Sequence, residues 1–180
     1  MAKHRSCNTF EVLYDKVKEY IADKEELELI EKAYKYAYDK HFGEKRLTGE
    51  DYITHPLSVA YILTSINADA STIAGALLHD AIEEKDVDLE EFKQLFGEDI
   101  LSITLGVSKI NKLNFSGDNE SVITNQRKIL VGLSEDVRVI IIKLADRLHN
   151  MKTLFVLDER KQKETAKETL DILTPIAHRL

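Results

Sequence analysis

The stretch Ala76-Leu77-Leu78-His79-Asp80-Ala81-Ile82-Glu83-Glu84 places a histidine and an aspartate side by side in an otherwise apolar segment. On a helix, Glu83 lies one turn beyond His79 on the same side, and Glu84 lies one turn beyond Asp80. Burying ionisable side chains that have no partner is costly. Imidazole and carboxylate groups bind first-row metal ions, so we predict that a metal ion supplies the missing partner at this pair.

The composition describes one globular domain. Of its 180 residues, 43% are hydrophobic and 32% are charged, which is enough for a sizeable core. The apolar runs fall far short of the ~20 residues that a membrane span needs. The net charge of -7 argues against general binding to a nucleic-acid backbone, and the single cysteine, Cys7, excludes an intrachain disulfide. Since no apolar signal-peptide core is visible either, we predict a cytoplasmic protein that binds neither membranes nor nucleic acids.

The apolar residues recur at helical spacing, and only seven glycines and two prolines interrupt them. We expect helices over residues 9–20, 24–41, 56–66, 70–84, 88–97, 99–110, 121–133, 135–154 and 160–173. The sequence therefore predicts an all-α fold, a bundle of about eight to ten helices that forms one domain over residues 1–180. The last residues, from Pro175 to Leu180, read as the start of another helix, which is typical of a fragment of a longer protein.

Two polar residues outside the opening stretch, His55 and Asp146, are further candidates for the metal site. His55 lies immediately before a proline at the start of an expected helix, and Asp146 and Asn150 share one face of a long apolar helix. Each has a structural alternative. His55 can equally be a helix-entry residue, and Asp146 can pair with Lys143 or Arg147 on a solvated face.

The remaining ionisable residues have less specific patterns. Glu83 is at the right distance from His79 to act as a general acid or base, or to orient a water molecule. Glu84 fits the same role and equally fits an exposed acidic helix end. His149 lies one residue off the face of Asp146, so we expect a structural hydrogen bond for it. Surface positions are expected for the histidines in terminal or connecting segments, His4, His41 and His178.

Together, His55, His79-Asp80 and Asp146 give an H…HD…D pattern that resembles the HD superfamily of metal-dependent phosphohydrolases. Longer blocks resemble, more specifically, the hydrolase domain of RelA/SpoT-type alarmone enzymes. These blocks are residues 46–56, 77–80, 106–110, 125–128 and 142–151. The last of them, which ends in His149-Asn150-Met151, is the most specific.

The resemblance implies an HD-domain helical bundle with manganese-dependent hydrolase activity. The implied reaction removes the 3′-pyrophosphate of ppGpp or pppGpp to give GDP or GTP and pyrophosphate, in the degradation of stringent-response alarmones. Glu83 and Glu84 are implied to activate or orient the attacking water. The implied metal ligands are His55, His79, Asp80 and Asp146. The implied substrate contacts are Lys45, Arg46, Thr48, Lys143, Asn150, Thr153 and Leu154, with Arg46 stacked on guanine and Asn150 near the ribose.

This sequence departs from the family pattern at three points. Glu84-Lys85 stands where the family usually has Asp-Thr, Thr48 replaces a common serine, and Thr124 replaces a common acidic residue. None of these changes removes an implied metal ligand. Residues 170–180 resemble the connector that leads into a ppGpp synthetase domain, so we expect such a domain in cis. Two alternatives stay open: an HD phosphohydrolase for another nucleotide such as NADPH, and a non-catalytic nucleotide-sensing module.

Overall fold

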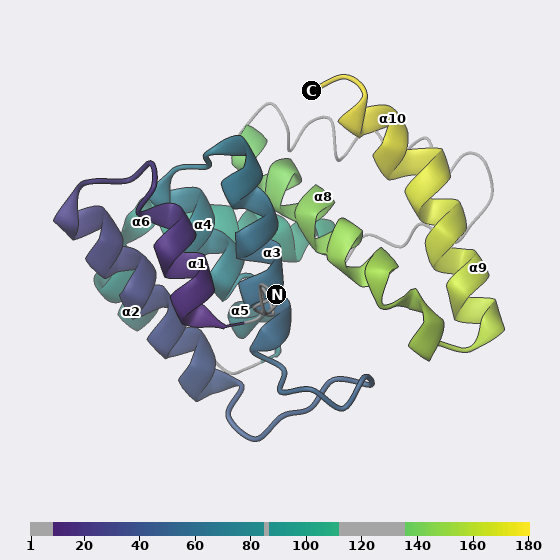
Figure 1. Cartoon of the computed structure of the whole chain (residues 1–180), viewed down its shortest axis with the longest axis horizontal. Coiled ribbons are helices and arrows are strands. Elements are labelled where there is room, and N and C mark those ends of the chain that lie inside the picture. Colours follow the sequence, from purple (N-terminus) through teal and green to yellow (C-terminus); the bar gives the residue numbers. More distant parts are fainter. Residues whose placement is uncertain (1–8, 85–86, 112–135) are drawn as a thin grey trace, which may run out of the picture.

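The computed structural model describes residues 9–84, 87–111 and 136–180, and over these residues it contains helices and no strand. The prediction of an all-α fold is confirmed. The helix expected over residues 121–133 lies outside the described residues. In chain order the α-helices are α1 (Phe10–Val17), α2 (Lys24–Lys40), α3 (Thr54–Leu63), α4 (Ala70–Leu78), α5 (Ala81–Glu84), α6 (Leu89–Asn111), α8 (Val137–Lys152), α9 (Glu159–Glu168) and α10 (Thr174–Ala177) (Figure 1).

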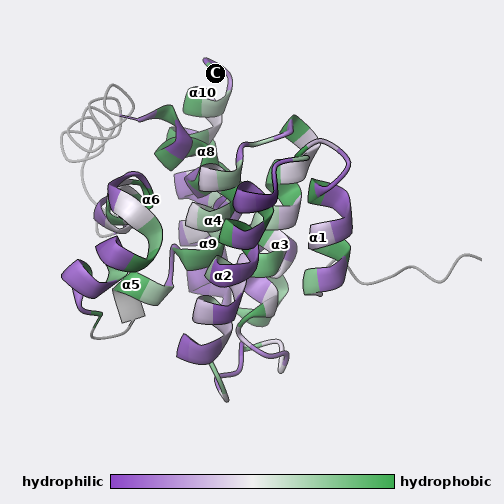
Figure 2. Cartoon of the chain, turned by 90° about the vertical axis from the view of Figure 1, so that its left-hand side faces the viewer, coloured by the Kyte–Doolittle hydropathy of each residue, from purple (hydrophilic) through white to green (hydrophobic). Residues whose placement is uncertain are grey.

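Helix α4 forms the centre of the molecule. All of its residues except Ser71 are buried, and it packs against α2, α3, α6 and α8. The buried residues of α2 recur at helical spacing, as Ile30, Ala33 and Ala37, and its hydrophilic residues face outward (Figure 2). Helices α9 and α10 lie on the other side of α8 from α1 and α2 (Figure 1). Among the described residues, no helix combines the length and the apolar character that crossing a membrane requires.

Two glycines allow α6 to approach its neighbours closely. A Cβ atom at Gly75 of α4 would lie 2.8 Å from Cγ2 of Ile103 on α6. A Cβ atom at Gly106 of α6 would lie 2.7 Å from Cγ2 of Val139 on α8. Both distances are shorter than carbon atoms tolerate without movement, so the spacing of these three helices depends on the missing side chains.

An arginine near the start of α8 joins three helices. Arg138 lies 2.6 Å from Asp136, which caps α8, and 2.6 Å from Asp99 on α6. Its guanidinium is also 4.0 Å from Asp69, the residue that caps α4. Hydrogen bonds from Arg138 lower the pKa of both Asp99 and Asp136 below the ordinary value. The network fixes the beginning of α8 against the core.

The helix predicted over residues 70–84 is wrong in one respect, because the structure divides it at His79 and Asp80. Helix α4 ends at Leu78, and α5 begins at Ala81. The ring nitrogen Nδ1 of His79 lies 2.7 Å from the carbonyl oxygen of Ala76. In a continuing helix that carbonyl would accept from the amide of Asp80, so the histidine side chain takes the place of one backbone hydrogen bond. His79 and Asp80 therefore lie outside regular helical structure.

The end of the chain confirms the prediction that another helix starts near Pro175, but no break separates it from the helix before it. A π-helical turn, Thr169–Leu173, joins α9 directly to α10. Pro175 in α10 has no N–H, so the carbonyl group four residues before it loses its regular helical donor. The hydroxyl group of Thr174 donates to the carbonyl oxygen of Thr169, 2.9 Å away, and so satisfies a backbone acceptor within this turn.

Candidate functional site

A cavity of about 500 Å³ lies between the loop that precedes α3 and the helices α8 and α9. Helix α8 supplies one wall, the loop supplies another, and Thr165 of α9 closes a third side. Ten of the residues predicted for the site line this cavity. They are Lys45, Arg46, Thr48, His55, Asp80, Lys143, Asp146, Asn150, Thr153 and Leu154.

His79 lies behind this lining and is fully buried. A carbonyl oxygen can only accept a hydrogen bond, so Nδ1 of His79 must donate its hydrogen to Ala76. The other ring nitrogen, Nε2, is buried and makes no hydrogen bond within the described part of the chain, although it lies 3.1 Å from Oδ1 of Asp80. A histidine that donates through one nitrogen and keeps the other free has the arrangement of a metal ligand.

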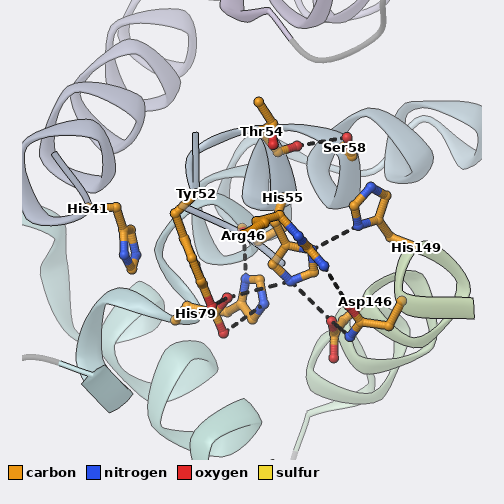
Figure 3. A network of polar contacts seen from close by, with 12 residues as sticks. His41, Arg46, Tyr52, Thr54, His55, Ser58, His79, Asp146 and His149 are labelled. Carbon is orange, nitrogen blue, oxygen red and sulfur yellow. Dashed lines mark hydrogen bonds and ion pairs between the residues drawn. The ribbon is translucent and has the colours of Figure 1, made fainter. Parts of the chain in front are cut away.

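Three of the four side chains predicted to hold a metal form one cluster, and the fourth, Asp146, contacts it through His55; His55, His79 and Asp146 are labelled in Figure 3. One potential ligand atom from each of His55, His79 and Asp80 lies within 4.8 Å of the others. Nε2 of His55 lies 3.2 Å from Oδ1 of Asp146 and 3.5 Å from Oδ2 of Asp80. Two imidazoles and the carboxylate of Asp80, with the carboxylate of Asp146 beside His55, are a donor set that suits a divalent cation. The unpaired Nε2 of His79 fits such an ion, because the cation would give this buried atom its partner.

The electrostatic balance at this point keeps Asp146 charged. Burial alone would raise its pKa, but a hydrogen bond with His55 and the charge of Lys143 hold the pKa well below the ordinary value. Nζ of Lys143 lies 2.9 Å from Oδ2 of Asp146, and Nδ2 of Asn150 donates to Oδ1 over 2.6 Å. Burial lowers the pKa of His55, so its ring is neutral and keeps a lone pair.

Two aromatic residues support Asp80 in a way that the sequence did not predict. The hydroxyl group of Tyr52 donates to Oδ2 of Asp80 over 3.0 Å, and the ring of His41 stacks on Tyr52 with centroids 4.5 Å apart. The surface position predicted for His41 is wrong. The residue is buried, because its ring packs on Tyr52. Its Nδ1 atom lies 2.9 Å from a carboxylate oxygen of Glu44. No periodicity could reveal these contacts, since Tyr52 and Asp80 are 28 residues apart in the chain.

The hydrogen bond expected of His149 is present, and its partner is His55. The Nδ1 atoms of the two rings lie 2.8 Å apart. Burial lowers the pKa of His149 to about 4, so this ring is neutral near pH 7. His149 therefore contacts one of the predicted metal ligands without lying among them.

The loop before α3 holds Arg46 against α8. An isolated bridge pairs Lys45 with Asp51, and the amide of Arg46 donates to the carbonyl oxygen of Glu50 over 2.9 Å. Gly49 closes this loop with a φ of 89°, which favours glycine. Nη2 of Arg46 then donates to Oδ1 of Asn150 over 3.3 Å. The loop thus brings an arginine to the side of the cavity that carries the polar face of α8.

Several polar atoms of the cavity wall are buried and have no hydrogen-bond partner among the described residues: Nη1 of Arg46, Oγ1 of Thr48 and Nε of Arg147. The Nη2 atom of Arg147 forms an ion pair with Glu168 of α9. Buried donors without partners are uncommon in folded proteins, and in a cavity wall they are groups that a polar ligand could satisfy. The positive charges of Arg46, Lys143 and Arg147 around the cavity suit an anionic ligand.

The structure places Glu83 and Glu84 in α5, immediately after the two polar residues that divide the helix. Their side chains lie outside the described part of the structure, so their predicted roles stay predictions. Thr124 and residues 125–128 also lie outside the described residues.

Comparisons with known proteins agree with this geometry. A family model described as an HD domain matches residues 33–180. The guanosine-3′,5′-bis(diphosphate) 3′-pyrophosphohydrolase of Aquifex aeolicus is 47% identical over 153 residues, which cover 85% of this chain and 22% of that protein. The bifunctional (p)ppGpp synthase/hydrolase SpoT of Escherichia coli is 43% identical over 171 residues, covering 95% of this chain and 24% of that protein.

A solved structure of a metazoan ortholog of SpoT, described as hydrolysing ppGpp and having a role in starvation responses, is also similar. It superposes with a TM-score of 0.62 at 25% sequence identity, and the match covers 81% of this chain and 85% of that chain. The chain spans about a fifth to a quarter of the length of the curated relatives it matches. From the family match over most of its length and the agreement of fold, this chain belongs to the HD-domain family.

Proposed function

We propose that this chain hydrolyses the 3′-pyrophosphate of ppGpp and pppGpp, giving GDP or GTP and pyrophosphate, with Mn²⁺ as the metal ion. One observation carries the proposal: His55, His79 and Asp80 form a cluster of potential metal ligands, Asp146 contacts this cluster through His55, and the adjoining cavity is also lined by Arg46. The relatives named as ppGpp hydrolases support the choice of substrate.

The four converging side chains would hold the cation, which would neutralise phosphate charge and make a nearby water more acidic. Hydrolysis needs that water to attack the phosphorus next to the 3′-oxygen while the bond between them breaks. We assign to Glu83 and Glu84 the acceptance of the proton from this water. This assignment is supported by their place in the short helix α5, which begins directly after His79 and Asp80.

The remaining wall would recognise the nucleotide. The planar guanidinium of Arg46 would stack on guanine, with Lys45, Thr48, Thr153 and Leu154 around the base, and all five residues line the cavity. Asn150 would contact the ribose from its position between Arg46 and Asp146. Lys143, which is buried beside Asp146, would add positive charge near the phosphates. This arrangement provides separate sites for the base and for the reacting phosphates.

We also propose that a ppGpp synthetase domain follows in cis and that the protein acts in the cytoplasm. Support for the first comes from the bifunctional relative, of which this chain covers only 24%. The second is supported by the single cysteine of the sequence, which agrees with a reducing compartment.

The proposed function is tested by incubating the purified chain with ppGpp and Mn²⁺ and measuring GDP and pyrophosphate by chromatography. We expect turnover by the wild type and a loss of at least about a thousandfold in Asp146→Asn, because a charged metal ligand is removed. Asp39→Asn, the same change at an exposed residue near the end of α2, should leave the rate unchanged.

The alternatives give different results in the same assay. Faster turnover of NADPH than of ppGpp would favour a hydrolase for another nucleotide. A wild type that binds Mn²⁺ and ppGpp but produces no GDP would be a sensing module, and the proposal would be wrong. If Glu83 handles the proton, Glu83→Gln should keep its affinity for ppGpp while losing turnover.

A further inference from the structure

We infer that His149 is a positioning residue for His55: it accepts the Nδ1 hydrogen of His55 and so leaves Nε2 of His55 free to bind the cation. The inference rests on the metal site of the proposed function and adds to it a residue that lies outside the ligand set.

The first step is the contact between the two rings. Nδ1 of His55 on α3 lies 2.8 Å from Nδ1 of His149 on α8, and the ring centroids are 5.0 Å apart. Two imidazole nitrogens at this distance share a single hydrogen, because one must donate and the other must accept. The tautomer of one ring therefore sets the tautomer of the other.

The second step concerns the opposite side of the His55 ring. Nε2 faces carboxylate oxygens of Asp146 and Asp80, at 3.2 Å and 3.5 Å. Without a cation, an Nε2 hydrogen donated to Asp146 satisfies this geometry, and Nδ1 of His55 then accepts from His149. With a cation among these groups, Nε2 must present its lone pair, so the hydrogen of the neutral ring moves to Nδ1. His149 must then accept, and the two histidines change tautomer together.

The third step is the comparison with His79, which has a fixed donor side. A backbone carbonyl, that of Ala76, accepts its Nδ1 hydrogen at 2.7 Å, and a carbonyl cannot exchange roles. His55 depends instead on a side chain from another helix. Of the two candidate imidazole ligands, His55 is therefore the one whose tautomer can be altered by substituting a residue that is not itself a ligand.

The position of His149 suits this task. It follows Asp146 by three residues and precedes Asn150 on α8, so one helix supplies a candidate metal ligand, the acceptor for a second ligand and a substrate contact. A movement of α8 relative to α3 would alter all of these together.

The test compares two substitutions of similar size. His149→Asn places an amide oxygen near the position of Nδ1 and keeps an acceptor, whereas His149→Leu fills the space without one. We expect the dissociation constant for Mn²⁺, measured by electron paramagnetic resonance, to rise about tenfold to a hundredfold in the leucine variant. It should stay within about threefold of the wild type in the asparagine variant. The exposed His178→Leu is the control.

A second measurement reads the tautomer directly. ¹⁵N NMR of the histidine rings in the wild type, with Zn²⁺ as a diamagnetic probe, should show the hydrogen of His55 move from Nε2 to Nδ1 when the metal is added. Equal Mn²⁺ affinity in a folded leucine variant, or a hydrogen that remains on Nε2 with Zn²⁺ bound, would overturn the inference. If the leucine variant does not fold, the wild-type spectrum decides.

Neither measurement uses ppGpp. Failure to hydrolyse ppGpp would therefore contradict the proposed substrate and leave the role of His149 intact. Conversely, an unchanged tautomer in a protein that hydrolyses ppGpp would remove only the role of His149.

Discussion

Asn150 connects the two sides of the candidate site through a single amide group. Its Nδ2 donates to Asp146 and its Oδ1 accepts from Arg46. The orientation of the amide is determined, because a carboxylate can only accept and a guanidinium can only donate. The residue proposed to hold the base and a proposed metal ligand are therefore linked by two hydrogen bonds.

At this scale the clearest prediction concerns Arg46. Arg46→Ala should raise KM for ppGpp by about fivefold with little change in kcat, because stacking of a guanidinium on a base contributes on the order of 1 kcal/mol to binding. Arg46→Lys should show most of the same effect, since lysine keeps the positive charge but lacks the planar guanidinium group that stacks on a base. Steady-state kinetics with Mn²⁺ would measure both, with the exposed Arg179→Ala as control. A fall in kcat at constant KM would contradict this role.

The sequence was informative about which residues carry chemistry and less so about their support. The pairs His79-Asp80 and Asp146 with Asn150 are visible because charged groups interrupt apolar helices. Tyr52 and His41 are not, because each looks like an ordinary packing or surface residue until the fold brings Tyr52 to Asp80 and His41 onto Tyr52. Such contacts depend on tertiary distance, which local spacing does not contain.

At the scale of elements, the positions of the helices can be predicted from the spacing of apolar residues, except at His79 and Asp80. The break between α4 and α5 was not predicted, because nothing in the local pattern tells that the side chain of His79 bonds to Ala76. By contrast, the boundary expected at Gly97 is confirmed, since this residue has a φ of 84° inside α6. Glycine marks such a position in the sequence, whereas a histidine does not.

The contact between α6 and α8 gives a prediction at the same scale. Gly106→Ala should destabilise the fold by roughly 1 kcal/mol, because the cost of overpacking against Val139 exceeds the gain in helix propensity. In the Gly106→Ala background, Val139→Ala should cost less than it does in the wild type. Urea unfolding of the four proteins measures this coupling, and additive effects would show that the two residues do not interact.

At the scale of the whole molecule, Arg138 ties α4, α6 and α8 together and gives the fold a dependence on acid. The pKa values of Asp99 and Asp136 are lower in the folded than in the unfolded chain. Their contribution to stability is therefore present above the ordinary carboxyl pKa of about 4 and is lost as the pH falls through the lower, folded values.

We predict that Arg138→Met lowers the free energy of unfolding by about 1 kcal/mol at pH 7, a modest value because the partners are partly exposed. The difference from the wild type should shrink as the pH falls from about 5 to about 2. Chemical denaturation at each pH measures it. Arg160→Met, which removes an exposed ion pair of 4.0 Å, should change stability by less than about 0.5 kcal/mol, and an equal effect of both variants would contradict the prediction.

The cavity wall also has a consequence for the order of events during synthesis. Its residues extend from Lys45 to Thr165, and the hydrogen bond from Arg46 to Asn150 joins residues 104 positions apart. A ribosome must therefore release the chain through Thr165 before a ligand can bind to a complete pocket. Nascent chains that end before this residue lack part of the binding wall, so we expect them not to bind the nucleotide as the complete domain does.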